Sequence, residues 1–498
     1  MNVARNVEQA SLYFPDKPAL IFEDKAYTFK ELNEQVNRLA NALKALGIEK
    51  GDRAAFFLPN IPAFVVGYFA VQKLGAIAVS VNSMSKQRET KYILNDAECK
   101  VLFTTSELRE QVPTEELSSL KYIIIAEGDA GKDLDMSGLM AKGASDCHYL
   151  DLHPDDPAAI LYTSGTTGFP KGATLTQMNI VSNSASAGNC SGYNPQDRLL
   201  LFLPLFHCFG QNYIMNAAYN KCAALVLCRR FEPEPVLDVM ARHRVTMIFA
   251  VPTVYIHYIN MDTSKYDLSS LRYCFTAAAI MPKATALQWH EKFGMWTHEG
   301  YGLTESSPFA TYNHSFRHKH GSVGTPIENV DVKIVDFEGN DLPLGEKGEI
   351  VIRGPNVMKG YWGKPEATEQ AFFPNGWLRS GDIGRMDDEG YFFIEDRLKD
   401  MIIAAGFNVY PSEVEQVLYQ YPAVKETAVY GVPDPIRGET VCASVILKDG
   451  MSATEEDIIE FCRSNMAVYK VPRKVIFSGQ LPKSPTGKIL KRVLRGDK

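Results

Sequence analysis

Thr163-Ser164-Gly165-Thr166-Thr167-Gly168-Phe169-Pro170-Lys171-Gly172 is a ten-residue stretch with three glycines, four hydroxyl side chains and one lysine. Apolar runs at 158–161 and 173–175 flank it, which predicts two strands joined by an irregular loop. Glycines let successive backbone N–H groups approach an anion, and the lysine adds positive charge. The spacing differs from that of the Walker loop, G-x-x-x-x-G-K-[ST]. The stretch therefore predicts a phosphate-binding loop of another kind. A flexible linker is disfavoured, because linkers seldom lie between two apolar strands.

Composition and charge narrow the class of protein. The chain has 498 residues, of which 45% are hydrophobic and 22% charged, and its formal net charge is −7. This length predicts two or more domains, and the negative charge argues against nucleic-acid binding. Residues 463–498 differ from the rest, with ten Lys or Arg and one acidic residue. Such a basic segment is typical of a solvated tail or of a docking face for an anionic small molecule.

The patterns of cysteine, histidine and apolar residues predict the cellular location of the protein and whether it has a histidine metal site. The nine cysteines include no C-x-x-C, which favours free thiols in a reducing compartment. The N-terminus has no apolar signal-peptide core, and the apolar region 54–81 is interrupted by two prolines and Lys73. We therefore expect no transmembrane segment and a cytoplasmic location. The His314–His320 patch lacks a third ligand at metal-site spacing, and we interpret it as a polar loop.

Alternating helix and strand patterns predict an α/β fold. Residues 54–58, 76–81 and 101–104 are apolar runs typical of buried strands, and a helical stripe begins at Thr28. This order predicts largely parallel sheets covered by helices, with ligands beyond the carboxyl ends of the strands.

The pattern changes in the last third of the chain, which gives the expected domain boundaries. From about residue 321 the apolar residues alternate, which predicts an antiparallel β subdomain over 321–396. A boundary near 397 then separates a large N-terminal domain, 1–397, from a small α+β domain, 398–498.

Six stretches in order along nearly the whole chain resemble the motifs of the adenylate-forming superfamily, which includes acyl-CoA synthetases, peptide-synthetase adenylation domains and beetle luciferases. They are Thr163–Gly172, Pro204–Gly210, Tyr301–Glu305, Trp377–Asp382, Asp396–Asp400 and Pro485–Lys488. The resemblance looks closest to fatty acid–CoA ligases. It implies that ATP activates a carboxylic acid to an acyl-adenylate and then to its CoA thioester, with release of pyrophosphate and AMP. It also implies that the small C-terminal domain is mobile and closes as a lid.

The resemblance implies a site for ATP and Mg²⁺. A carboxylate that attacks the α-phosphorus of ATP brings two anions together, so positive charge must gather around the phosphates. The loop at 163–171 would wrap the β- and γ-phosphates and Glu305 would hold Mg²⁺. Asp382, assisted by Arg397, would accept hydrogen bonds from the ribose, and Tyr301 would stack on adenine. The implied ATP- and AMP-binding residues are Thr163, Ser164, Gly165, Thr166, Thr167, Gly168, Lys171, Ala278, Ala279, Ile280, Gly300, Tyr301, Gly302, Thr304, Asp382, Arg397 and Asn408.

Catalytic roles are implied for Lys488, Lys399, Thr304 and Glu305. The ammonium group of Lys488 would bridge the substrate carboxylate and the α-phosphate, which offsets charge in the transition state. Lys399 occupies the hinge about which the C-terminal domain rotates between the two half-reactions. We therefore expect Lys399→Pro to block thioester formation more than adenylation.

The C-terminal domain also carries the implied CoA contacts. Ala405, Gly406 and Phe407 fall where the family's loop enters the pantetheine tunnel. Ile403 stands where some aryl-CoA ligases carry an additional lysine, so no phosphate contact is available from that position.

Residues around Phe206-His207 indicate the class of acid. Peptide-synthetase domains carry an Asp near this position to hold an amino group, and the absence of a carboxylate here disfavours an amino-acid substrate. The expected acyl pocket is apolar and consists of His207, Cys208, Phe209, Tyr213, Phe249, Ala277, Pro308 and Phe309. Burial of each methylene in such a pocket gains about 0.8 kcal/mol. This favours a medium- or long-chain fatty acid, with a flat aryl acid as the alternative.

The sequence is compatible with more than one acyl acceptor and more than one overall class of function. The leading interpretation is a ligase that uses ATP, Mg²⁺ and CoA. The second is an enzyme that loads the phosphopantetheine of an acyl carrier protein, because the basic segment suits an acidic carrier equally well. An inactive protein of the same fold is disfavoured by the intact Lys488, Glu305, Asp382 and Arg397. A luciferase-like oxygenase shares all of the motifs.

Overall fold

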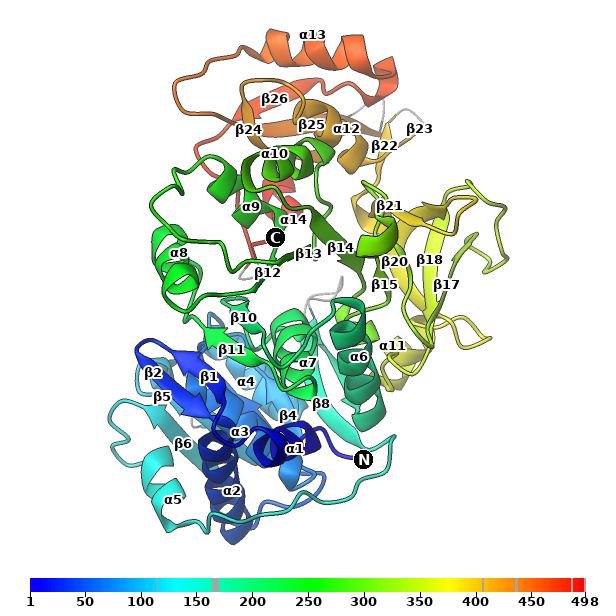
Figure 1. The fold of residues 1–498 in the computed structure, drawn as a ribbon. Coiled ribbons are helices and arrows are strands. Elements are labelled where there is room, and N and C mark those ends of the chain that lie inside the picture. Colours follow the sequence, from blue (N-terminus) through cyan, green and yellow to red (C-terminus); the bar gives the residue numbers. More distant parts are fainter. Residues whose placement is uncertain (114, 164–169, 405–406, 435–437, 485–486, 497–498) are drawn as a thin grey trace.

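The structure is a computed structural model that describes residues 1–498 except 114, 164–169, 405–406, 435–437, 485–486 and 497–498. Two large sheets form the N-terminal part, and a smaller antiparallel sheet and the C-terminal unit follow them (Figure 1).

The first large sheet contains the strands that flank the glycine-rich loop. Its order is β19-β9-β8-β4-β3-β5-β6-β7. The members are β3 (Arg53–Phe56), β4 (Ile77–Ser80), β5 (Val101–Thr105), β6 (Tyr122–Glu127), β7 (Leu134–Asp135), β8 (Pro157–Thr163), β9 (Lys171–Thr176) and β19 (Gly360–Tyr361). Strands β3 to β8 pair in parallel, whereas β9 and β19 join one edge antiparallel. The expected strand–loop–strand arrangement is confirmed as the β8–β9 hairpin.

The second large sheet has the order β16-β15-β14-β13-β12-β10-β11-β1-β2. Its members are β1 (Pro18–Phe22), β2 (Lys25–Thr28), β10 (Arg198–Leu201), β11 (Ala224–Leu227), β12 (Met247–Ala250), β13 (Tyr273–Thr276), β14 (Thr297–Tyr301), β15 (Thr311–Tyr312) and β16 (Thr325–Pro326). The central strands are parallel and buried, as apolar runs with helices on both faces require. The predicted α/β class is confirmed.

Helices cover both large sheets. They are α1 (Arg5–Tyr13), α2 (Phe29–Ala45), α3 (Pro62–Lys73), α4 (Gln87–Asp96), α5 (Met136–Lys142), α6 (Gln177–Cys190), α7 (Ala217–Asn220), α8 (Pro233–Arg242), α9 (Pro252–Ile259), α10 (Lys283–Phe293) and α11 (Pro365–Gln370). Helix α2 begins where predicted, because Thr28 and Glu31 form a reciprocal capping box. The turn predicted after β10 is present at 205–207, but it continues into a buried π-helix, Phe209–Asn216, which the sequence did not indicate.

Residues 331–397 form the antiparallel sheet that the alternating pattern predicts. Its order is β17 (Asp331–Val335), β18 (Gly348–Arg353), β20 (Leu378–Met386) and β21 (Phe392–Arg397). Two short segments of the expected 321–396 subdomain leave this sheet: β16 joins the second large sheet, and β19 joins the first. The segment therefore connects all three sheets.

The C-terminal unit is a small α+β arrangement with its own core around Val414, Leu418, Val429 and Ile458. Its strands are β22 (Ile402–Ala404), β23 (Phe407–Val409), β24 (Val424–Asp434), β25 (Gly438–Leu447) and β26 (Lys474–Phe477), and its helices are α12 (Pro411–Leu418), α13 (Glu455–Asn465) and α14 (Lys491–Arg495). In Figure 1 it lies above the green strands β12–β14 and beside the yellow antiparallel sheet.

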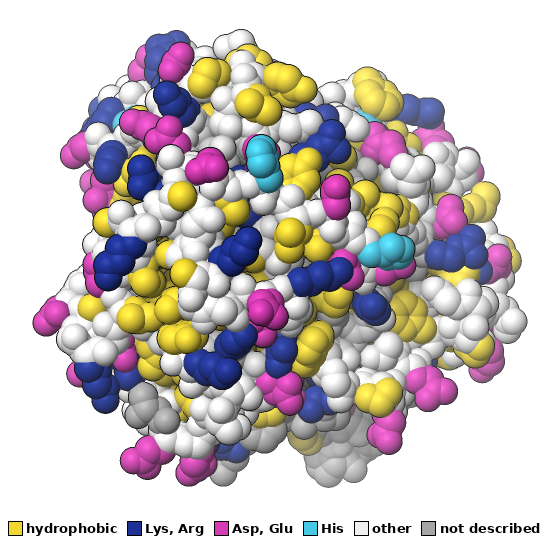
Figure 2. All heavy atoms as spheres, turned by 90° about the horizontal axis from the view of Figure 1, so that it is seen from below, with side chains coloured by type: hydrophobic (Ala, Val, Ile, Leu, Met, Phe, Trp, Pro, Cys, Tyr) yellow, Lys and Arg dark blue, Asp and Glu magenta, His cyan; other side chains and the backbone are white. Residues whose placement is uncertain are grey.

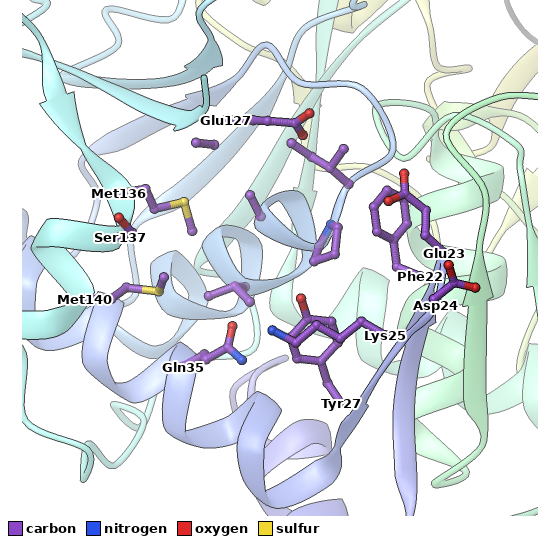
Figure 3. Close-up of a pocket in the computed structure, with 15 residues that line it drawn as sticks. Phe22, Glu23, Asp24, Lys25, Tyr27, Gln35, Glu127, Met136, Ser137 and Met140 are labelled. Carbon is purple, nitrogen blue, oxygen red and sulfur yellow. The ribbon is translucent and has the colours of Figure 1, made fainter. Parts of the chain in front are cut away.

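The surface and one pocket complete the description. Acidic and basic side chains are interspersed on the face seen from below in Figure 2. A pocket of about 560 Å³ lies beside the β1–β2 hairpin, with Met136 and Met140 on one wall and Glu23 and Asp24 on another (Figure 3). The described residues that line it include none of the predicted site residues.

Within the described part of the chain, no helix combines the length and apolarity that crossing a membrane requires.

Candidate functional site

Asp382 joins two of the motifs that lie far apart in sequence. Register pairing of β20 with β21 sets Asp382 opposite Arg397, and Arg397 Nε lies 3.2 Å from Asp382 Oδ1. The hydroxyl of Tyr301, at the end of β14, donates a hydrogen bond of 2.8 Å to Asp382 Oδ2. The Asp382 carboxylate is buried, and its charge raises the pKa of the Arg397 guanidinium. A carboxylate acceptor therefore lies between the tyrosine hydroxyl and a cation, as expected for a ribose-binding carboxylate.

At the end of β14, Gly300 and Gly302 let the backbone around Tyr301 pass close to neighbouring segments. A Cβ on Gly302 would lie 1.7 Å from the Pro308 carbonyl oxygen, and one on Gly300 would lie 2.7 Å from the Phe275 ring. Only glycine fits at Gly302 without a shift of backbone. Thr304 follows at the start of a 3₁₀ turn, Thr304–Ser306.

Ala278, Ala279 and Ile280 follow the carboxyl end of the neighbouring strand β13. Ala278 has φ +68°, and Ala278 and Ala279 are exposed. Their location at a strand end agrees with the rule that ligands lie beyond the carboxyl ends of parallel strands.

Glu305 is buried and fixed by two hydroxyl groups. Thr163 Oγ1 donates to Glu305 Oε1 at 3.2 Å, and the Tyr361 hydroxyl donates to the same oxygen at 2.9 Å. The Nζ of Lys171 lies 5.2 Å from the centre of the Tyr361 ring. An oriented carboxylate beside the hydroxyl-bearing Thr304 suits Mg²⁺, which binds oxygen ligands and shares them with substrate phosphates. Among the described residues no group of three or more His, Cys, Asp or Glu could hold a metal ion.

Several predicted residues lie outside the described part of the chain. These are Ser164, Gly165, Thr166, Thr167 and Gly168 of the loop, and Ala405 and Gly406 of the expected CoA-binding segment. The two ends of the loop are described, and Thr163 pairs with Lys171 across the hairpin. Phe407 forms the first residue of β23, with its backbone opposite Ala404.

Lys488 lies on a turn that packs against the N-terminal part. The preceding Gly487 has φ +82°, and a Cβ there would lie 2.9 Å from Val251 Cγ2. Burial, together with the nearby Arg397 cation, lowers the pKa of Lys488 to about 8. Burial also lowers the pKa of His207 to about 4, with a smaller contribution from the Lys488 charge. The Lys488 ammonium is therefore electrostatically coupled both to the Asp382–Arg397 pair and to His207 of the expected acyl pocket.

Lys399 and Asn408 occupy different surroundings in the C-terminal unit. Lys399 lies in the 3₁₀ turn Leu398–Asp400, and Arg495 binds its carbonyl oxygen and the Asp400 carboxylate, at 3.3 and 3.2 Å. Burial and the Arg397 charge lower the pKa of Lys399. Asn408 is exposed on β23, opposite Ile403.

The expected acyl-pocket residues form a packed aromatic cluster. Tyr213 on the π-helix stacks on Phe275 at 4.6 Å between ring centres and contacts the edge of Phe309 at 4.9 Å. Phe209 and Phe249 complete the cluster and are buried. Cys208 is also buried, whereas His207, Ala277 and Pro308 are only partly buried at its border. In this structure the aromatic side chains pack against one another, and their role as the wall of an acyl pocket stays a prediction.

The sequence reasoning missed residues that only long-range contacts place in the site. Phe275 stacks on Tyr213, and Tyr361 contacts both Glu305 and Lys171. Below the aromatic cluster, Ser191 Oγ lies 2.9 Å from the Tyr213 hydroxyl and accepts a hydrogen bond of 3.0 Å from Tyr273. An aromatic residue that follows a glycine was the only local signal for Tyr361.

Comparisons with known proteins identify the family of this chain. The family model described as AMP-binding enzyme matches residues 7–362, and the AMP-binding enzyme C-terminal domain matches residues 413–488. The chain therefore belongs to the AMP-binding enzyme family, and the resemblance seen in the motifs is confirmed.

Individual relatives cover nearly the whole chain. A long-chain-fatty-acid–CoA ligase of Bacillus subtilis is 37% identical over 97% of this chain and 92% of its own length. A feruloyl-CoA synthase of Amycolatopsis sp is 38% identical over 97% and 96%. The structure of the anthranilate CoA ligase AuaEII in complex with anthranoyl-AMP has a TM-score of 0.94 at 31% identity, and covers 100% of this chain and 97% of that one.

Proposed function

We propose that the protein is an AMP-forming acid–CoA ligase. It would activate a carboxylic acid with ATP and transfer the acyl group to the thiol of CoA. The observation that carries this proposal is the polar cluster in which Asp382 binds the Tyr301 hydroxyl and Arg397, and Glu305 binds Thr163 of the β8–β9 hairpin. Lys488, next to the turn residue Gly487 that packs on Val251, would serve the α-phosphate of ATP and the carboxylate of the acid together.

In the first half-reaction, the substrate carboxylate oxygen attacks the α-phosphorus of ATP, and pyrophosphate leaves. Asp382 and Tyr301 hold the nucleoside, and the hairpin residues Thr163 and Lys171 bind the departing phosphates. Lys488 offsets the negative charge that builds up on the α-phosphate oxygens. Glu305 would hold Mg²⁺ with Thr304, and the cation neutralises phosphate charge when bound.

In the second half-reaction, the CoA thiol loses its proton and its sulfur attacks the acyl carbonyl carbon, and AMP leaves with the bonding electron pair. The C-terminal unit would rotate about Lys399, which withdraws Lys488 and presents the segment at 405–407 to pantetheine. A hinge at Lys399 is supported by its location in the short turn Leu398–Asp400, directly after β21.

A medium- or long-chain fatty acid is the first candidate substrate. The cluster around Tyr213 and Phe249 is apolar, and relatives named long-chain-fatty-acid–CoA ligases match over the full chain. An alkyl chain that enters this region must displace aromatic side chains from their present packing.

An aryl acid is the second candidate substrate, favoured by a specific observation. Tyr213 and Phe275 are stacked in parallel, and rings of this kind also pack well on a flat aromatic acid. The similarity to a feruloyl-CoA synthase and to an anthranilate CoA ligase supports this candidate.

One assay separates these candidates. Pyrophosphate exchange into ATP is measured across a panel of saturated acids of increasing length and of hydroxylated and amino-substituted aryl acids. Exchange that depends on alkyl acids supports the first candidate, and exchange limited to aryl acids supports the second. Release of AMP is then compared with free CoA and with an acyl carrier protein, because the basic segment 463–498 suits either acceptor. Exchange with none of the acids would contradict the proposal.

A cytoplasmic location also belongs to this proposal. All nine cysteines fall within the described residues and are free thiols. Free thiols are typical of proteins in reducing compartments. Fractionation of the producing cell would test this location.

A further inference from the structure

Tyr361 is placed in the ATP site by strand pairing rather than by a local motif. The two-residue strand β19 pairs antiparallel with β9, with Tyr361 opposite Ala173. The backbone N–H of Trp362 donates to the Gly172 carbonyl oxygen at 2.8 Å, and the Tyr361 N–H donates to Thr368 Oγ1 at 2.9 Å. These bonds fix both sides of the tyrosine backbone at the edge of the β8–β9 hairpin.

The register brings Tyr361 to the same face of the sheet as the two ends of the glycine-rich loop. Lys171 lies two residues before Ala173 on β9, and Thr163 lies opposite Lys171 on β8. Residues two apart on a strand, and residues opposite each other on neighbouring strands, share a face. The contacts of Tyr361 with Lys171 and of Thr163 with Glu305 agree with this register.

Tyr361 contacts two opposite charges at once. Its hydroxyl donates to Glu305 Oε1 at 2.9 Å, and the Lys171 ammonium lies over its ring at 5.2 Å from the centre. The ring attracts the cation through its electron-rich face, while the hydroxyl binds the anion in the ring plane.

We propose that Tyr361 is a positioning residue of the ATP site, which holds the carboxylate of Glu305 and the ammonium of Lys171 apart and oriented for Mg²⁺ and phosphate. This inference rests on the proposed function. Without the tyrosine, the two opposite charges would be free to pair directly, and each would be neutralised before ATP arrives.

The test separates the two contacts of Tyr361 with two variants. Tyr361→Phe removes the hydroxyl and keeps the ring for Lys171, whereas Tyr361→Leu removes both. The matched control is Tyr391→Phe, because the Tyr391 hydroxyl also donates a hydrogen bond, to the Arg317 carbonyl oxygen at 2.6 Å. Lys319 also lies over its ring, at 5.1 Å.

ATP binding is measured by calorimetry over a range of Mg²⁺ concentrations, with neither acid nor CoA present. We expect Tyr361→Phe to raise the Mg²⁺ concentration needed for half-maximal binding by about 10-fold, since a hydrogen bond to a charged group is lost. Excess Mg²⁺ should restore its ATP affinity. Tyr361→Leu should also weaken ATP binding at saturating Mg²⁺, by about 3- to 10-fold. Tyr391→Phe should bind ATP like the wild type at every Mg²⁺ concentration.

The result that overturns the inference is an unchanged Mg²⁺ dependence in Tyr361→Phe, or a wild type whose ATP binding does not depend on Mg²⁺. A variant that loses ATP affinity equally at all Mg²⁺ concentrations would also overturn it, because that pattern indicates general loss of structure. The proposed function is tested separately by the acid-dependent exchange reaction. If the wild type binds ATP but shows no pyrophosphate exchange with any acid, the proposed function is contradicted. The calorimetric test of Tyr361 can still be interpreted in that case.

Discussion

Lys488 interacts electrostatically with Asp382 of the polar cluster around Asp382 and Glu305, and with His207 at the border of the aromatic cluster around Tyr213, but different forces hold the two clusters. Asp382 binds Tyr301, 81 residues away, and Glu305 binds Thr163, 142 residues away, each through a hydrogen bond with one fixed partner atom. Tyr213 instead packs among several rings at 4.6 to 5.9 Å between centres, and only its hydroxyl has a fixed partner, Ser191 Oγ at 2.9 Å. Directional bonds tolerate few substitutions, whereas packing tolerates many if volume is kept. Substitutions in the polar cluster should therefore impair the use of ATP, whereas substitutions in the aromatic cluster should change which acid is preferred.

The largest effect should come from the lysine that both clusters share. We expect Lys488→Ala to lower the rate of acyl-adenylate formation by about 1,000-fold or more, because it removes charge stabilisation from the transition state. Thioester formation from supplied acyl-adenylate should be spared. The control is Lys483→Ala on the same segment, whose side chain pairs with Glu426 at 2.9 Å outside the site. Normal pyrophosphate release by Lys488→Ala would refute the assigned role.

A smaller effect is expected from a substitution in the polar cluster alone. Asp382→Asn removes the charge that binds Arg397 and should raise the KM for ATP by about 10- to 100-fold. The KM for the acid should change by less than about 3-fold, since the aromatic cluster is untouched. Initial rates of pyrophosphate exchange measure both values, with Asp387→Asn, an ion-pair partner of Lys319, as the control. Equal changes in the two KM values would show that the clusters are not independent.

The pH dependence should reveal the shared lysine without a mutation. The Lys488 pKa is lowered to about 8, so its ammonium is present below this pH and lost above it. We expect kcat/KM for ATP to fall by about 5-fold between pH 8 and pH 9, because this parameter reports the free enzyme. Lys488→Arg should move the fall beyond pH 10, since guanidinium stays protonated. An unchanged profile in that variant would assign the fall to another group.

The smallest effect is expected on the aromatic side. Tyr213→Leu should improve kcat/KM for an acid by about 4-fold for each additional methylene that the vacated space accommodates. The KM for ATP should stay within about 2-fold of the wild type. Removal of the ring should also lower the free energy of unfolding by about 2 to 4 kcal/mol. Competition between two acids of different length measures the preference, and a changed ATP KM without a changed preference would contradict the comparison.

Much of the fold and of the polar cluster could be predicted because the signals are local. The strand–loop–strand pattern at 157–176, the capping box at Thr28 and the alternation at 331–353 each occupy one short segment. The motifs that contain Tyr301, Asp382 and Arg397 also lie in short stretches, and the structure brings their side chains together.

The aromatic cluster could not be predicted with the same success. The sequence indicated an apolar pocket, but not the packing in which Tyr213 is stacked on Phe275, a residue absent from the expected lining. The π-helix that carries Tyr213 was not indicated either. Apolar residue types are equally suited to core and to pocket, so composition alone does not reveal which space they leave open.

The sequence by itself determined that this chain belongs to a family that activates acids with nucleotide, because six short motifs carry that chemistry in their residue types and spacing. Only the tertiary structure decided which residue contacts both Glu305 and Lys171. Tyr361 reaches Glu305 and Lys171 because β19 leaves its neighbours in sequence and pairs with β9. Strand pairing between distant segments depends on how all three sheets pack, and no local pattern around Gly360-Tyr361 encodes it.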